Sequence, residues 1–319
     1  MYENTAAAPR GEITELLEAA ADTEKFLIAD KIFPVHEVDR MAGWYPRLKI
    51  KEGSLLRAES TKRGPTGSYN EISRAVVRDN YRCEDRGLVE RVDDVLAEQY
   101  ADFFDMEVVT ARLVSRPVKF DHEREVAGRA FDSEIFTTLD PAAPYTEAGL
   151  ADIDFARDLQ DAQERLTKQQ VEPNTLVLSL QLWNRVRRSV KLQRYLFGDT
   201  NLDVKKLITP QHIADAFMIP NILVAKATYD VSAKGKEPDL RPIWSSDFFG
   251  IFNVQAGDFQ LGGVGRTLSW RADVPGGLFA TETYRDEGRR GDMVRVRCNV
   301  DEKVIDEASG VLVETGWTV

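Results

Sequence analysis

The sequence contains few of the residues from which metal sites and catalytic centres are commonly built. Its 319 residues include two cysteines and three histidines. Cys83 and Cys298 are too few for a disulfide framework and too far apart for a zinc motif, and this use of cysteine fits a reducing cytoplasm. His36, His122 and His212 lie in three separate regions, and the HEREV sequence at His122 lacks the second histidine of a zinc-binding helix. We therefore expect no metal and no cofactor.

Signatures of nucleotide binding and of nucleophilic catalysis are also missing. The stretch QLGGVGRT, residues 260–267, lacks the Lys-Ser/Thr pair of a phosphate loop and does not match the dinucleotide fingerprint, so it predicts a tight turn before a strand. No serine lies in a nucleophile elbow, and neither cysteine has a nearby histidine to activate it. Acidic pairs such as Asp93-Asp94 and Asp286-Glu287 could transfer protons, but adjacent acids in charge-rich segments are usually solvated. We expect a protein that is not an enzyme; an unrecognised carboxylate site is the alternative.

Long apolar runs and an excess of basic charge are absent as well. The N-terminal stretch has neither the basic region nor the apolar run of a signal peptide, and no stretch is apolar enough to span a membrane. A net charge of −11 and a pI near 5.0 argue against a protein that wraps nucleic acid, because phosphate contacts need clustered Lys and Arg. With 43% apolar and 30% charged residues, the chain can bury a sizeable core and predicts two folded units with appendages.

The stretch from Trp44 to Arg86 predicts one long hairpin. The extended runs WYPRLKIKEGSLLRA and ISRAVVRDNYRCEDR flank the turn-rich segment ESTKRGPTGSYNE. Arms of about 45 Å exceed the radius of gyration of about 19 Å expected for a compact body, so the hairpin should project. Because an isolated two-stranded hairpin is marginally stable in water, we expect another copy of the chain to cover it.

The hairpin and the segment after it differ in charge. Residues 47–86 contain ten Lys and Arg against six Asp and Glu, whereas residues 90–107 contain seven acids and one arginine. A basic arm and an acidic segment on one chain suit head-to-tail contacts between subunits, although solvated faces that merely alternate in sign are the alternative. The candidate contact residues are Arg57, Lys62, Arg63, Arg74 and Arg78 on the hairpin, and Asp93, Asp94, Glu98 and Asp102 on the acidic segment.

A long amphipathic helix is predicted from Asp102 to Phe131, reaching about 43 Å, with a kink or restart at Pro117. Its apolar stripe has spacings of three, four and seven. The stripe consists of Met106, Val109, Leu113, Phe120, Ala127 and Phe131. A shorter acidic helix is expected from Glu12 to Ala29, in an arm that docks on a neighbour.

Residues 146–274 are typical of a separate α/β unit. The spacing of Phe155, Leu159, Ala162 and Leu166 predicts a helix. We expect buried strands at 175–180, 222–227 and 248–254, a strand at 267–271, a basic helix over 181–197 closed by Gly198, and a helix that starts at Thr209-Pro210.

The last segment predicts strands only, in LFATETY, MVRVRCNV and VLVET. Val294, Val296 and Cys298 alternate with Arg295 and Arg297, which predicts one buried and one wet face. We expect all three strands to pack under the long helix.

The order of these parts resembles the major capsid proteins of tailed bacteriophages with the Hong Kong 97-type fold. The stretches that carry the resemblance are FLIADKIFPVHEV, FFDMEVVTARLV, EREVAGRAF, PNTLVLSLQLWNRVRRSVKLQRYL, ITPQHIADAFMIPNILVAKATYD, IWSSDFFGIFNV and YRDEGRRGDMVRVRCNVDEKVI. The resemblance implies an α+β fold in five parts. These are an N-terminal arm (1–42), an E-loop hairpin (43–88), a P-domain with a spine helix (89–145), an inserted α/β A-domain (146–274) and closing P-domain strands (275–319).

The resemblance implies self-assembly into hexamers and pentamers that form an icosahedral shell around a double-stranded DNA genome. It implies a location in the virion after assembly in the cytoplasm of a bacterial host, with portal, scaffolding and decoration proteins as further partners, weak and non-specific DNA contact, and no membrane. Some members crosslink an E-loop lysine to a P-domain asparagine; Lys62 and Asn299 are the candidate analogues here, and the sequence does not determine whether they pair. An encapsulin-like nanocompartment enclosing a cargo enzyme is the alternative within the same fold.

Overall fold

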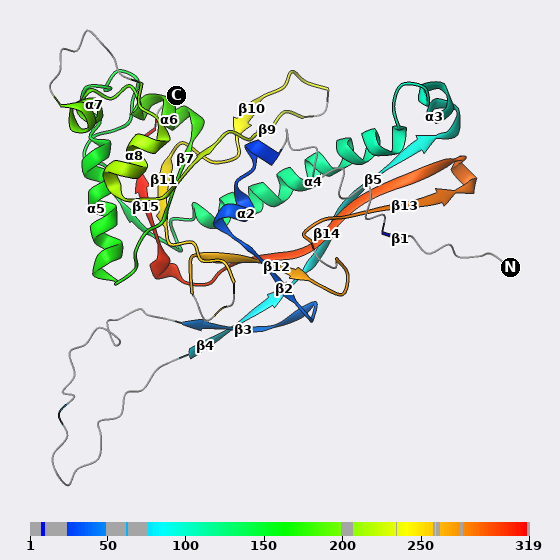
Figure 1. Cartoon of the computed structure of the whole chain (residues 1–319), viewed down its shortest axis with the longest axis horizontal. Helices are drawn as coiled ribbons and strands as arrows, with labels where there is room; N and C mark the ends of the chain where they lie inside the picture. Colours follow the sequence, from blue (N-terminus) through cyan, green and yellow to red (C-terminus); the bar gives the residue numbers. More distant parts are fainter. Residues whose placement is uncertain are drawn as a thin grey trace.

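A computed structural model describes residues 8–9, 24–48, 62, 76–198, 207–233, 235–257, 259, 262–274 and 277–317. In these residues a five-stranded sheet with four short helices occupies one end of the body, and a six-stranded sheet with one long helix extends to the other end (Figure 1). The shorter elements are η1 (Glu24–Phe26), α2 (Ala29–Ile32), β9 (Thr228–Asp230), β10 (Leu240–Pro242), η3 (Glu287–Arg289) and η4 (Glu307–Ser309).

The six-stranded sheet is built on β14 (Gly291–Val304). One side of β14 pairs with β13 (Ala280–Asp286) and β12 (Gly265–Trp270), and the other side pairs with β5 (Glu84–Asp93), all antiparallel. β2 (Val35–Val38) lies parallel to β12, and β1 (Ala8–Pro9) pairs with β13. The predicted alternation is confirmed, because Val294, Val296 and Cys298 are buried whereas Arg295 and Arg297 lie on the opposite, partly exposed face.

The predicted long helix is α4 (Met106–Ala130), and it runs through Pro117 without interruption. The Asp105 side chain caps its first turn by accepting hydrogen bonds from the backbone of Glu107 and Val108. The expected restart of the helix at Pro117 is therefore wrong. Pro117 is exposed, so water can solvate the carbonyl that its missing N–H leaves unbonded.

The buried face of α4 differs from the predicted stripe. Leu113 is 61% exposed, whereas small and β-branched residues face the body. The buried residues are Thr110, Ala111, Val114, Ser115, Val118, His122, Glu123, Val126, Ala127 and Ala130. Short side chains let the helix lie close to the strands beneath it, so a stripe chosen for large apolar residues missed most of this face.

The five-stranded sheet has the order β6 (Thr137–Leu139), β15 (Gly310–Glu314), β11 (Phe248–Phe252), β7 (Thr175–Ser179) and β8 (Asn221–Ala225). The predicted stripe of α5 (Phe155–Lys168) is confirmed, since Phe155, Leu159, Ala162 and Leu166 are all buried in the core beside this sheet. Burial of each large side chain contributes roughly 1.5–3 kcal/mol.

Two further helix predictions have different outcomes. Thr209 caps α8 (Pro210–Phe217) in a capping box with His212, as the Thr-Pro sequence predicts. The single basic helix is wrong, because the segment forms α6 (Leu180–Val186) and α7 (Val190–Phe197). Ser189 between them accepts a hydrogen bond from the backbone of Leu192 and starts α7, which ends as predicted at Gly198.

The assignment of two strands to their sheets is also corrected. β15 was expected under the long helix but pairs with β11 and β6 in the five-stranded sheet. β12 was expected in the unit 146–274 but pairs with β14 and β2 in the six-stranded sheet. Both are short buried strands, and their hydrophobic pattern does not encode which sheet they join.

The glycine-rich stretch forms the predicted turn before β12. Gly262 and Gly263 have positive φ angles of 66° and 97°, a backbone conformation that favours glycine. The buried Arg266 guanidinium donates to the carbonyl oxygens of Gly262 and Gly265, both at 2.8 Å. Burial lowers the pKa of Arg266. The loop therefore has a structural role in holding the start of β12.

The base of the predicted hairpin is present as an antiparallel pair of β3 (Ala42–Leu48) and β4 (Val76–Arg82), which extends away from the body in Figure 1. Apart from Lys62, residues 49–75 lie outside the described part of the chain. The second run was expected to continue in the hairpin to Arg86. Instead it leaves the hairpin at the buried Cys83 and continues as β5 beside β14.

Candidate functional site

A buried carboxylate joins three separate segments at the middle of the molecule. Glu123 on α4 is 1% exposed and accepts hydrogen bonds from the backbone N–H groups of Ile28 (3.0 Å) and Ala29 (2.9 Å) and from the indole Nε1 of Trp244 (2.6 Å). Burial raises the pKa of Glu123, and these donors act in the opposite direction. Glu123 therefore anchors the N-terminal segment and the loop before β11 to the long helix.

His122, the preceding residue, forms a second buried connection. Its Nδ1 lies 2.9 Å from a Glu302 carboxylate oxygen, and its Nε2 lies 3.2 Å from Asp30. Burial would lower the pKa of His122, but the hydrogen bonds to Asp30 and Glu302 outweigh it and raise the pKa to about 9. Arg86 contacts the same Glu302 oxygen at 3.4 Å. The charged imidazole thus links α2, α4 and β14.

The opposite face of the six-stranded sheet carries an ion-pair ladder. Glu282 accepts from both Arg295 and Arg297, and Arg297 also donates to Asp273. Burial raises the pKa of Glu282, but the two guanidinium groups outweigh this effect and lower it overall. Asn299 is 3% exposed and its Nδ2 donates to Asp273 at 3.0 Å. The asparagine that was matched to a crosslinking position is therefore buried within its own chain.

The predicted hairpin residues fall mostly beyond the described ranges. Arg57, Arg63 and Arg74 lie outside the described residues, and Lys62 is exposed. The guanidinium of Arg78 lies over the ring of Trp44 at 4.5 Å from the centroid, and Trp44 is itself 56% exposed.

Two of the four predicted acids are engaged within the chain. Asp94 forms a two-pronged ion pair with Arg285, with a 2.7 Å contact, and the hydrogen bond to Arg285 lowers its pKa. Asp93 caps α3 (Asp94–Tyr100) and contacts Arg91 at 3.1 Å. Glu98 and Asp102 are exposed, and no ion pair involves either of them among the described residues. The structure thus brings all four acids to one end of the body, where α3 lies (Figure 1).

The same end carries an exposed apolar surface that the sequence reading missed. We call it the α3 tip, consisting of Val95, Leu96, Tyr100, Phe103 and Phe104. These side chains are 42% to 80% exposed, and no residue of α3 itself is buried. The signal was present in LAEQYADFF, where apolar residues recur at spacings of four and three. The distribution of charge in this segment predicted only its acids as contact residues.

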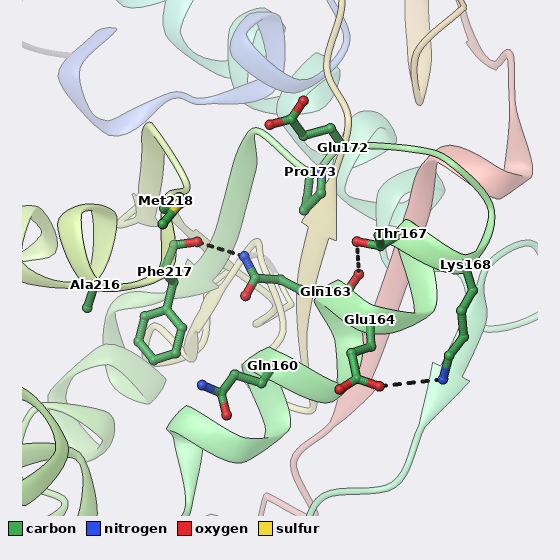
Figure 2. A pocket seen from close by; sticks show the side chains of 10 residues that line it. All are labelled: Gln160, Gln163, Glu164, Thr167, Lys168, Glu172, Pro173, Ala216, Phe217 and Met218. Atoms are coloured by element: carbon green, nitrogen blue, oxygen red, sulfur yellow. Dashed lines mark hydrogen bonds and ion pairs between the residues drawn. The ribbon is translucent and has the colours of Figure 1, made fainter.

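A groove of about 880 Å³ lies between α5 and α8 (Figure 2). Gln163 of α5 donates to the carbonyl oxygen of Phe217 at 2.8 Å, and Met218 beside it is 87% exposed. A smaller cavity of about 310 Å³ at the base of α3 includes Asp94, whose pKa is lowered rather than raised. Because Asp94 in the smaller cavity is already paired with Arg285, these two hollows do not add support to the alternative of a carboxylate site.

The described residues were also compared with the requirements of metal binding and of thiol nucleophiles. No group of three or more His, Cys, Asp or Glu side chains there could hold a metal ion. Cys83 and Cys298 are buried, and burial raises the pKa of each thiol to about 12, so neither is a reactive nucleophile. None of the described helices combines the length and apolarity needed to span a bilayer.

Comparison by sequence gives no relative, since no family model and no curated protein matches the chain. Comparison of structures gives matches over nearly the whole length. A phage-related protein from Bordetella bronchiseptica RB50 is 18% identical with a TM-score of 0.71, and the match covers 98% of this chain and 99% of that one. A virus-like particle from Pyrococcus furiosus is 14% identical with a TM-score of 0.56, covering 96% and 100%. The capsid of the cyanophage P-SCSP1u is 10% identical with a TM-score of 0.55, covering 98% and 90%. The chain therefore has the fold of phage capsid proteins.

Proposed function

We propose that the protein is the major capsid protein of a tailed bacteriophage, with the Hong Kong 97-type arrangement of its parts. The observation that carries this proposal is the structural match of 98% of the chain to a phage-related protein and to a phage capsid. The mixed sheet-and-helix body and the strand pair that leaves it are consistent with the expected P-domain, A-domain and E-loop.

In this proposal, copies of the chain form hexamers and pentamers that close into an icosahedral shell around a double-stranded DNA genome. Assembly takes place in the cytoplasm of the bacterial host and the protein then resides in the virion. Portal, scaffolding and decoration proteins are the further partners, and DNA is contacted weakly because the chain carries a net charge of −11. The chain's role is structural rather than enzymatic.

The contact residues remain part of the proposal, with different weights. Glu98, Asp102 and Arg78 are exposed and can contact another copy. Asp93 and Asp94 already stabilise their own chain, so their contribution to a contact between copies is indirect. Arg57, Lys62, Arg63 and Arg74 belong to the hairpin that is proposed to lie over a neighbour.

The experiment is electron microscopy of the purified protein, alone and after co-expression with its scaffold. Shells or capsomer rings are expected, and a strictly monomeric particle under both conditions refutes the proposal. Deletion of residues 59–71 should leave the chain folded by circular dichroism and prevent shell formation. The matched control replaces the same residues by a Gly-Ser segment of equal length, which separates the loss of the side chains at the hairpin tip from the loss of chain length.

An encapsulin-like nanocompartment is the second candidate, because one solved structure with this fold, at a TM-score of 0.56, is described as a virus-like particle and not as a phage capsid. The two functions differ in what the shell contains. Nuclease-resistant DNA in shells isolated from the native source supports the phage capsid, whereas a single co-purifying enzyme in DNA-free shells supports the nanocompartment.

A further inference from the structure

Two exposed surfaces of this chain are complementary to each other and too far apart to meet within one molecule. The first is the α3 tip, which forms one end of the body (Figure 1). Because α3 buries none of its own residues and has only seven of them, it gains little stability from its own chain. Five large apolar side chains within ten residues are exposed at this tip, and an accumulation of exposed apolar groups is typical of protein contacts.

The α3 tip also carries exposed negative charge. Glu98 and Asp102 are exposed, and among the described residues neither has a cation within ion-pair distance. Asp93 and Asp94, by contrast, are satisfied by Arg91 and Arg285. A partner for this tip therefore needs an apolar centre and basic groups at its edge.

The second surface is the outward face of the β3–β4 pair. Trp44 lies opposite Asn80, so the diagonal neighbours on the same face are Arg78 and Arg82. All four residues are exposed, and Trp44, at 56%, is the large apolar centre. No ion pair of Arg78 or Arg82 occurs in the described part of the chain, whereas the opposite face is fixed to the body through the buried Tyr45. We call this surface the Trp44 face.

We propose that the α3 tip of one chain binds the Trp44 face of a second copy. Apolar side chains meet at the centre of this contact, with Glu98 and Asp102 of one copy facing Arg78 and Arg82 of the other. The contact is heterologous, so each chain offers one surface of each kind and copies join head to tail into a ring or lattice. This inference rests on the proposed function, to which it adds a specific pair of surfaces built from the described residues.

Apolar substitutions on each side provide the first test. The variants are Phe103→Ser with Tyr100→Ser on the tip, and Trp44→Ser on the face, with Leu240→Ser as the control because Leu240 is 64% exposed on β10, outside both surfaces. The tip variant and the Trp44 variant should each keep the wild-type circular dichroism spectrum and lower the yield of shells by about tenfold or more, since aromatic anchors dominate contact energies. The Leu240 variant should assemble normally.

Mixing the two variants tests the head-to-tail geometry. Neither variant should associate alone, but an equimolar mixture should form 1:1 pairs by sedimentation velocity, because one variant keeps its face and the other its tip. Association of the Trp44 variant with itself contradicts the proposal, since it means that the tip binds another tip. The absence of pairs in the mixture also contradicts it.

Charge reversal tests the charged residues at the edge of the contact independently of its apolar centre. Arg78→Glu with Arg82→Glu should prevent assembly, and adding Glu98→Lys with Asp102→Lys to the same chain should restore it. If the variant with all four substitutions is folded but does not regain assembly, the proposed pairing is refuted. If the wild type forms shells and the variants form them equally well, the contact is wrong while the proposed function stands. A wild-type chain that forms neither shells nor smaller oligomers refutes both.

Discussion

Removal of the Glu123 carboxylate should strongly destabilise the protein, because three donors from two other segments depend on it. In Glu123→Ala the backbone N–H groups of Ile28 and Ala29 and the indole N–H of Trp244 lose their acceptor. Ile28, Ala29 and Trp244 are at most 5% exposed, so water cannot replace the carboxylate without rearrangement.

The magnitude follows from the number of donors. Each buried donor left unsatisfied costs about 1–3 kcal/mol, which gives about 3–9 kcal/mol for three. Removing a carboxylate whose burial raises its pKa recovers part of its own desolvation cost. We therefore expect a loss of about 3–5 kcal/mol, a large share of the 5–15 kcal/mol by which proteins are usually stable. Glu123→Gln, which keeps one carbonyl acceptor, should lose about half as much.

The assay is urea unfolding of the purified, unassembled chain followed by circular dichroism. Glu125→Ala is the matched control, because Glu125 is the same residue type two positions along α4, is half-buried, and has no hydrogen bond or ion pair among the described residues. Its free energy of unfolding should change by less than about 0.5 kcal/mol. A change below about 1 kcal/mol in Glu123→Ala would refute the role of this carboxylate as an anchor.

Three further predictions concern the same helix and sheet. Because the pKa of His122 is raised to about 9, the stability that its charged form provides is complete below pH 6.5 and is lost as the pH rises towards 9. The free energy of unfolding should therefore fall by on the order of 3 kcal/mol over that range. If His122→Gln shows an equal fall over the same range, the fall does not come from His122 and the prediction is contradicted. Pro117→Ala should stabilise the protein by about 1–3 kcal/mol in urea unfolding, because it restores a helical hydrogen bond at an exposed position, and unchanged or lower stability counts against it. Gly87→Ala should destabilise the protein by about 1–3 kcal/mol, because the new Cβ would lie 2.7 Å from Cβ of Arg297. Gly128→Ala should stabilise the protein by about 1 kcal/mol, because no atom lies within 4 Å of the new Cβ. In thermal unfolding, the Tm of the two variants should shift in opposite directions.

Local sequence patterns identified the elements whose stability depends on near neighbours in the chain. The spacing of Phe155, Leu159, Ala162 and Leu166 predicted α5, and the Thr209-Pro210 pair predicted the start of α8. Alternation of valine and arginine in β14 predicted its two faces. In α5 and β14 the sequence pattern has the same period as the element, and in α8 the capping residue stands directly at the start of the helix, so each signal could be read directly.

Other features depended on what a segment packs against. The buried face of α4 consists mainly of small and β-branched residues, together with His122 and Glu123, and it does not coincide with the stripe of large apolar residues. β12 and β15 are both short strands with mostly buried residues, yet long-range pairing places them in different sheets. The partners of Asp93 and Asp94 could not be read from the sequence either, since Arg285 lies 191 residues from Asp94.

The sequence alone determined the helices α5 and α8, the hairpin base, the polar face of β14 and the uneven distribution of charge, because these properties arise from residues close together in the chain. Only the tertiary structure decided that α3 exposes its apolar side chains at one end of the body, that Trp44 and two arginines share an outward face, and that Glu123 holds three segments together. These depend on which surfaces remain uncovered after distant strands have paired and buried donors have found acceptors, and local patterns do not record that outcome.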